Sequence, residues 1–125
     1  MPSSTEPGSR WLLSAARGLV QDRDVTAIRS WQRATALLAR QSLEEGLNEL
    51  WAVKAPGLEQ ASARIQLTCL PEFLSGELAT DVAYAWASLT RACHQDGYEV
   101  GLTDGELLGH CETVDRLLDR LGRIL

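Results

Sequence analysis

A chain of 125 residues is long enough to bury the core of one domain and too short for two. Hydrophobic residues make up 45% of it and charged residues 23%, which is typical of a globular protein and excludes a wholly disordered one. The 12 Lys and Arg residues against 17 Asp and Glu residues give a formal net charge of -5, so a domain that grips nucleic acid by bulk charge is not expected. This balance leaves room only for a local basic pocket.

The start of the chain predicts a disordered lead followed by a short helix. Residues 1–9 are polar and include two prolines, and no basic run leads into an apolar one as it does in a signal peptide. Residues 10–21 carry apolar side chains at helical spacing. Asp24 then has the chemistry of a helix N-cap, so we expect the next helix to begin directly after it.

The longest predicted helix covers residues 25–53. Its wide apolar stripe is suited to burial against more than one neighbour. Gly46 lies inside this helix, where glycine costs about 1 kcal/mol relative to alanine, and this cost predicts a close contact with another helix. Ala55, Pro56 and Gly57 end the helix. The stripe consists of Trp31, Ala34, Leu38, Leu43, Leu47, Leu50 and Trp51.

A shorter helix is expected at residues 58–70. Pro71 ends it, because proline has no backbone N–H to donate and its ring clashes with the preceding helical turn. The apolar residues Phe73 and Leu74 follow, and we expect them to close one end of the core.

Two long helices with a short polar segment between them complete the chain. Ser75 predicts the N-cap of a helix over residues 76–95. Thr103 and Glu106 have the spacing of a capping box, which predicts a last helix over residues 104–122. The apolar stripes are Leu78, Val82, Ala85, Leu89 and Cys93 in the first of these helices and Leu107, Cys111, Val114, Leu118 and Leu121 in the second.

These patterns predict one fold class. No stretch of five or more residues alternates convincingly between apolar and polar, and the chain has one Phe and two Tyr, so a sheet is not expected. Long amphipathic helices with short connections are typical of antiparallel neighbours. We therefore expect an all-α protein, an antiparallel up-down bundle of four to five helices. It forms a single domain over residues 10–125, after the disordered lead over residues 1–9.

The cysteines and the hydropathy predict the compartment. Cys69, Cys93 and Cys111 are odd in number and form no C-x-x-C pair, which argues against a disulfide framework and favours a reducing cytoplasm. No apolar run approaches the length of about 20 residues that spans a bilayer. We expect a cytoplasmic protein with no membrane partner.

The polar segment between the last two helices carries the candidate site. Arg91, His94, Asp96 and Tyr98 follow one another there. An arginine can hold a phosphate bidentately, and a histidine titrates near neutral pH and can move a proton. The same residues also fit an ordinary helix end, because cationic side chains favour a helix C-terminus. Composition alone leaves both interpretations open.

A family resemblance enters at this segment. Arg91, followed after four residues by Asp96-Gly97-Tyr98, resembles the R-x4-H-G-Y signature of the HEPN superfamily. Residues 39–50 resemble the family's long helix, and residues 98–107 with the helix after them resemble its closing part. The resemblance implies a HEPN-like bundle that forms a homodimer, with the two arginine-containing segments over a shared cleft. In active members the motif Arg and His cut RNA without metal, so no cofactor is implied.

This chain departs from the family's motif at one position. Arg91 would stabilise the phosphate charge in the transition state, but Asp96 stands where the family has histidine. A carboxylate ionised at neutral pH cannot donate a proton and repels a phosphate. His94 lies two residues earlier, about 200° around a continuing helix, and can replace the missing imidazole only if the backbone unwinds there.

The resemblance with this departure predicts a non-catalytic module. As a dimer it would bind RNA, a nucleotide or a protein partner, such as an antitoxin or a defence component. The alternative is a metal-independent endoribonuclease that uses Arg91 with His94 or Asp96. The candidate ligand-binding residues are Arg91, Tyr98 and Glu44. Glu44 is expected either on a solvated helix face or, if it points inward, in a salt bridge with Arg91.

The cysteines, histidines and tryptophans are expected to have structural rather than functional roles. Cys93-His94 and His110-Cys111 offer zinc-ligand side chains, but adjacent residues of a helix point about 100° apart, so no metal site is expected. Cys93 and Cys111 also fall on apolar stripes, where a thiol acts as a small hydrophobe. Four tryptophans are expected in the core or at a dimer contact rather than as platforms for base stacking: Trp11, Trp31, Trp51 and Trp86.

Overall fold

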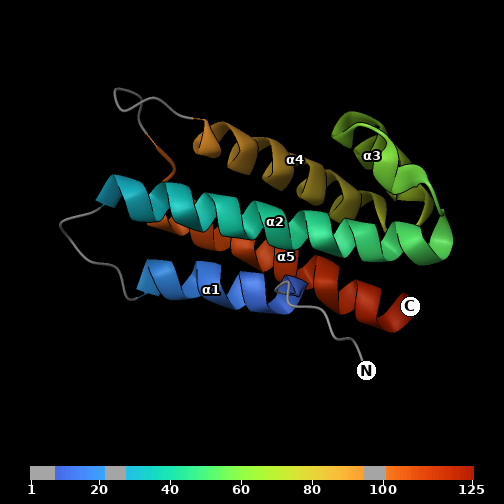
Figure 1. Cartoon of the computed structure of the whole chain (residues 1–125), viewed down its shortest axis with the longest axis horizontal. Helices are drawn as coiled ribbons and strands as arrows, with labels where there is room; N and C mark the ends of the chain where they lie inside the picture. The colour runs from blue at the N-terminus through green and yellow to red at the C-terminus, as the bar shows by residue number, and fades with distance from the viewer. Residues whose placement is uncertain (1–7, 22–27, 95–100) are drawn as a thin grey trace.

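The computed structural model describes residues 8–21, 28–94 and 101–125, and within these ranges the chain is helical and contains no β-strand (Figure 1). The prediction of an all-α bundle is therefore confirmed. None of the helices in the described ranges is long and apolar enough to span a bilayer. The α-helices are α1 (Ser9–Gln21), α2 (Ile28–Lys54), α3 (Ala63–Cys69), α4 (Gly76–Cys93) and α5 (Asp104–Ile124), with short 3-10 helices η2 (Leu58–Gln60) and η3 (Leu70–Glu72).

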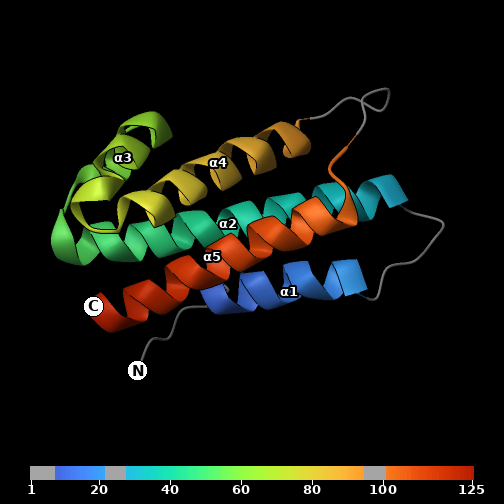
Figure 2. The same ribbon diagram turned by 180° about the vertical axis from the view of Figure 1, so that it is seen from behind.

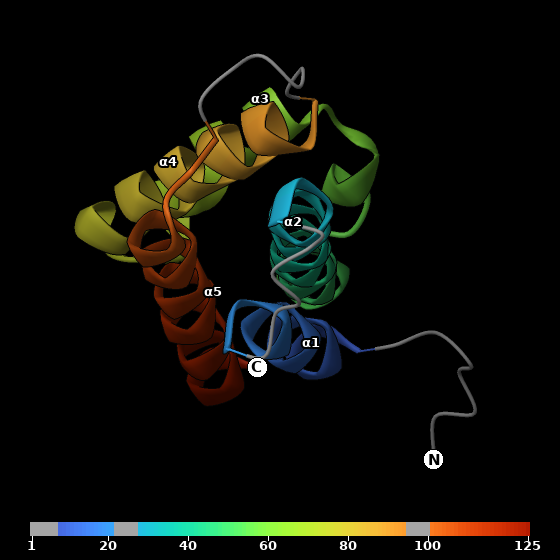
Figure 3. The ribbon, with the colours of Figure 1, turned by 90° about the vertical axis from the view of Figure 1, so that its left-hand side faces the viewer.

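The four long helices lie side by side. In Figure 1, α1 and α4 run in one direction, whereas α2 and α5 run in the opposite one. Figure 2, from behind, shows α5 lying along α2. Both α2 and α5 contact each other and also α1 and α4. Figure 3 shows α1 and α4 on opposite sides of the bundle, and α3 lies beside α4 near the end of α2.

Several helix ends follow the predicted capping chemistry. The Ser75 side chain accepts a hydrogen bond from the backbone N–H of Leu78, as expected for the N-cap of α4. The capping box of α5 is complete, because the Thr103 hydroxyl accepts from the Glu106 N–H at 3.1 Å and the Glu106 carboxylate accepts from the Thr103 N–H at 3.0 Å. The predicted N-cap Asp24 lies outside the described residues. Helix α1 begins one residue earlier than predicted, at Ser9.

The single helix predicted over residues 58–70 is wrong. The chain forms η2 first, takes extended backbone at Ala61 and Ser62, and only then starts α3. The Ser62 hydroxyl accepts a hydrogen bond from the Ile65 N–H at 3.3 Å. Serine competes for backbone hydrogen bonds in this way and favours the start of a new helix over the continuation of an old one.

The core forms where α2 crosses α5, and Gly46 lies at that crossing. A Cβ atom on Gly46 would lie 2.8 Å from Leu118 Cδ2 and 3.5 Å from Leu121 Cδ1, closer in the first case than real Cβ atoms come. The close helix contact predicted at this glycine is confirmed. The largest fully buried side chains around it come from α2, η3, α4 and α5: Leu43, Leu50, Trp51, Leu70, Leu89, Leu107 and Leu117.

The tryptophans divide between core and surface. Trp31 and Trp51 are buried, and Trp86 packs against the core from its edge. Trp11 is 60% exposed, so its assignment to the core of this chain is wrong. It precedes the buried Leu13 by two positions, which places it about 200° around α1 on the outer face. A dimer contact through Trp11 stays a prediction.

Candidate functional site

The predicted site residues Arg91 and His94 lie at the C-terminal end of α4. Arg91 is in the last turn and His94 is the C-cap, and both side chains are exposed. His94 has left the helix, with φ −103° and ψ 9°, and its N–H donates to the Arg91 carbonyl oxygen at 3.2 Å. Their spacing of three residues places both on neighbouring solvent-facing positions. Asp96 and Tyr98 lie outside the described residues.

Glu44 does not join this site: it is half-buried, and it forms neither the salt bridge with Arg91 that was expected if it pointed inward nor part of a fully solvated face. Its carboxylate accepts a hydrogen bond from Trp86 Nε1 at 3.3 Å and faces Arg40 Nε at 3.7 Å. Trp86 and Arg91 are five positions apart on α4, so they point about 140° away from each other. Because Glu44 approaches α4 on the side of Trp86, it lies away from the side that carries Arg91.

The pKa of the Cys93 thiol responds to the charged side chains near the end of α4. Burial raises the pKa of Cys93, while Arg40 and Arg33 oppose this rise and Glu44 adds to it. Two arginines of α2 therefore act electrostatically at the end of the bundle that carries Arg91. The raised pKa keeps the thiol protonated at neutral pH, so Cys93 is a poor nucleophile.

The side of α4 that carries Arg91 also borders a recess against α5 with a volume of about 330 Å³. Tyr84, seven residues before Arg91, lies within about 20° of it around the helix. The Tyr84 ring lies 5.6 Å from that of His110, centroid to centroid. At the recess edge, Arg116 pairs with Asp81 at 2.9 Å. The recess therefore places an imidazole beside an aromatic ring and an ion pair.

The sequence singled out His110 only as a possible zinc ligand. In the structure it lines this recess. Burial lowers the pKa of His110 below its ordinary value of 6.5, and the charge of Glu106 partly opposes the shift. The imidazole is therefore neutral at pH 7. The sequence carried one sign of this buried position. His110 is a polar residue directly before Cys111, which lies on the apolar stripe of the predicted helix.

This shift predicts an acid sensitivity. The unfolded chain binds a proton at His110 near pH 6.5 and the folded chain only at lower pH, so the stability present above pH 6.5 is lost as the pH falls below it. We expect His110→Gln to flatten the decline of the free energy of unfolding between about pH 7 and pH 5, measured by urea titration. The lowered pKa of Glu106 acts in the same direction but below its ordinary 4.5, outside this window.

The matched control is His94→Gln, which removes an exposed imidazole at the end of α4. It should keep the decline of the free energy of unfolding that His110→Gln flattens. Parallel curves for wild type and His110→Gln would contradict the prediction.

The cysteines and histidines do not gather into a metal site within the described ranges, where no group of three or more His, Cys, Asp or Glu side chains could hold an ion. Cys111 is buried, and burial raises its pKa to about 11 despite the opposing charge of Arg17. A thiol in this setting does not readily become the thiolate that binds zinc.

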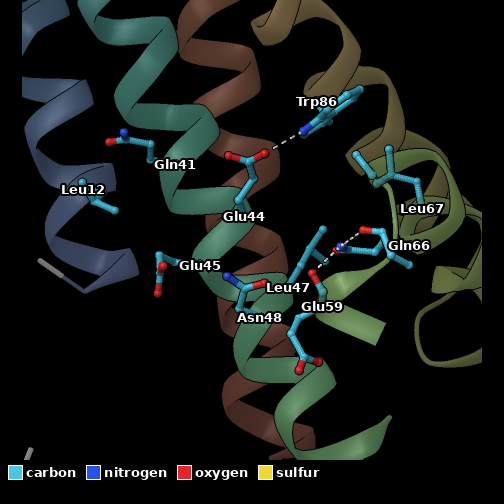
Figure 4. A pocket seen from close by; sticks show the side chains of 12 residues that line it. Leu12, Gln41, Glu44, Glu45, Leu47, Asn48, Glu59, Gln66, Leu67 and Trp86 are labelled. Carbon is cyan, nitrogen blue, oxygen red and sulfur yellow. Dashed lines mark hydrogen bonds between the residues drawn. The ribbon is translucent and has the colours of Figure 1, made fainter. Parts of the chain in front are cut away.

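A groove that the sequence analysis missed crosses the middle of α2, with a volume of about 520 Å³ (Figure 4). It extends from Leu12 of α1 to Gln66 of α3 and Trp86 of α4. The residues that α2 contributes follow helical spacing and resemble a solvated face in sequence. Only the α3 segment, which packs near them, turns that face into a groove. The lining from α2 is Gln41, Glu44, Glu45, Leu47 and Asn48.

Comparison of the chain with known proteins identifies no relative. No protein-family model, curated protein sequence or solved structure matches the chain. The HEPN resemblance therefore stays a prediction that rests on the order and spacing of the residues around Arg91.

Proposed function

We propose that this chain is a non-catalytic HEPN-like module that binds a phosphate-bearing ligand, RNA or a nucleotide, at the C-terminal end of α4. The observation that carries the proposal is the placement of Arg91 and His94, both exposed and one turn apart. No carboxylate of the described residues pairs with Arg91, whereas Arg10, Arg17 and Arg116 are each engaged in ion pairs. A guanidinium with no carboxylate partner among the described residues can offer its donors to a phosphate.

The chemistry at the two motif positions favours binding over catalysis. Metal-free cleavage of RNA needs one group to take the proton of the 2'-hydroxyl and another to protonate the leaving oxygen. Arg91 stays charged at neutral pH and can only stabilise negative charge. At the position of the family's histidine this chain has Asp96, and a carboxylate with an ordinary pKa carries no proton to donate at neutral pH.

One observation favours the alternative, a metal-independent endoribonuclease. The helix ends at Cys93, and His94 takes non-helical backbone. The end of the helix at Cys93 supports this alternative, because His94 can replace the missing imidazole only if the helix does not continue through it. An imidazole there could move a proton for a phosphate held by Arg91.

Binding and cleavage of RNA separate these two functions. Wild type, Arg91→Ala, His94→Ala and Arg120→Ala are incubated with a pool of single-stranded RNA in EDTA, and binding is measured by gel shift at fixed salt. We expect intact RNA throughout. Arg91→Ala should weaken binding about tenfold or more, because a hydrogen bond between charged groups contributes about 1.5–3 kcal/mol.

Arg120→Ala is the matched control, since Arg120 is exposed near the far end of α5, and it should bind as wild type does. Unchanged binding by Arg91→Ala would contradict the proposal. Cleavage that both Arg91→Ala and His94→Ala abolish would establish the endoribonuclease instead. Light scattering on the same samples tests the homodimer that the HEPN resemblance implies, and a monomer would contradict a cleft shared by two copies.

A further inference from the structure

We propose that the groove across α2 is a docking site for a basic segment of a partner protein, in which an arginine side chain lies along the apolar wall and ends at the carboxylates. The groove lies on the side of α4 that carries Trp86, away from Arg91. The inference is therefore independent of phosphate binding at the end of α4.

The shape of the groove suits side chains of a peptide. Its volume of about 520 Å³ falls within the range of about 300–1,000 Å³ that is usual for ligand sites. Leu47, Leu67 and Trp86 provide apolar surface. The carbon stem of an arginine packs on such surface while its charged head stays at the edge.

The walls of the groove are held in place before anything binds. Gln66 accepts a hydrogen bond from Trp51 Nε1 at 2.9 Å, and its amide donates to the Glu59 and Ala61 carbonyl oxygens at 3.2 and 2.9 Å. On the opposite side, the hydrogen bond from Trp86 orients Glu44 (Figure 4). A preformed site loses little entropy on binding, which favours affinity.

The charge of the groove selects the occupant. Three carboxylates line it, those of Glu44, Glu45 and Glu59, and no Lys or Arg is among its described lining residues. Arg40 balances only Glu44, at 3.7 Å. Near the groove, burial raises the pKa of Glu49 and the charge of Glu45 adds to this rise, whereas a hydrogen bond with Ser9 opposes it.

These charges repel a phosphate and attract a cation. Among basic side chains, arginine fits best, because a planar guanidinium pairs with carboxylates and stacks on an aromatic ring such as that of Trp86. A nucleic acid is thereby disfavoured at this surface, although it is proposed at the end of α4.

The test uses a short peptide that alternates arginine with leucine and alanine as the probe, and the same peptide with every arginine replaced by glutamate. Binding to the full chain is followed by NMR at the Trp86 indole N–H, which Trp86→Phe assigns, and by calorimetry. We expect the arginine peptide to bind and the glutamate peptide not to. Glu44→Gln with Glu45→Gln should weaken binding at least tenfold, and added salt should weaken it further.

Glu112→Gln, on the exposed face of α5 and outside the groove, is the matched control and should leave binding within twofold of wild type. Because Glu44 also holds Trp86, Glu45→Gln alone is a second variant that keeps this hydrogen bond, and circular dichroism checks the fold of each protein. Absent binding of the arginine peptide, equal binding of both peptides, or no effect of either glutamine variant would overturn the proposal. So would a loss of self-association in the double variant, which would identify a second copy of the chain as the occupant.

Discussion

Replacing Trp51 with alanine is expected to lower the free energy of unfolding by about 3–5 kcal/mol, a large share of the total stability of a small domain. The side chain is fully buried at the end of α2. Its ring meets that of Phe73 edge-on, with centroids 5.6 Å apart, and its Nε1 donates to Gln66. Truncation would leave a cavity and would also release Gln66, which holds the turn before α3.

Urea unfolding followed by circular dichroism measures this loss. Trp51→Phe keeps much of the apolar volume and removes the hydrogen bond to Gln66, so it should cost less than Trp51→Ala. Trp11→Ala is the matched control, and because Trp11 is exposed it should change stability by no more than about 0.5 kcal/mol. Similar losses for Trp11→Ala and Trp51→Ala would contradict the assigned core.

A second large effect is expected at Gly46, where valine should destabilise the fold by about 1–3 kcal/mol or more through overpacking. The first added carbon already lies 2.8 Å from Leu118 Cδ2, and Leu118 is itself buried. Gly46→Ala combines two opposing effects. The helix gains about 1 kcal/mol from the better propensity of alanine, and the contact with Leu118 removes much of that gain.

The comparison that isolates the contact is Gly109→Ala. Gly109 lies within α5, and a Cβ there would meet nothing within 4 Å. This variant should therefore gain stability by up to about 1 kcal/mol. Thermal and urea unfolding of the two alanine variants should differ in favour of Gly109→Ala. Equal gains would show that α2 and α5 do not meet closely at Gly46.

The helices were predictable because their signals are local. The N-cap at Ser75 and the capping box at Thr103 depend on groups three residues apart, and the apolar stripes depend on helical spacing. Gly46 was also informative from local sequence. Glycine lowers the stability of a helix, so its presence inside one indicates a close contact that compensates. The failure at residues 58–70 is also local, because Ser62 had the chemistry of an N-cap.

The site was predictable only in part. That Arg91 and His94 stand at a helix end follows from the polar segment that begins there. The partner of Glu44 did not follow, because it depends on how α4 is rotated against α2. The burial of His110 did not follow either, because it depends on Tyr84 of α4, whose ring packs against the imidazole.

The sequence by itself determined that this protein is a helical bundle, since periodicity and capping act over a few residues of one chain segment. It also determined where the polar end of α4 lies. Only the tertiary structure decided that Glu44 meets Trp86 and that Trp11 faces outward. It alone assembles the acidic groove, whose walls come from α1, α2, η2, α3 and α4. Such a surface depends on the rotation and crossing of whole helices, which the burial of their apolar stripes sets for the bundle as a unit.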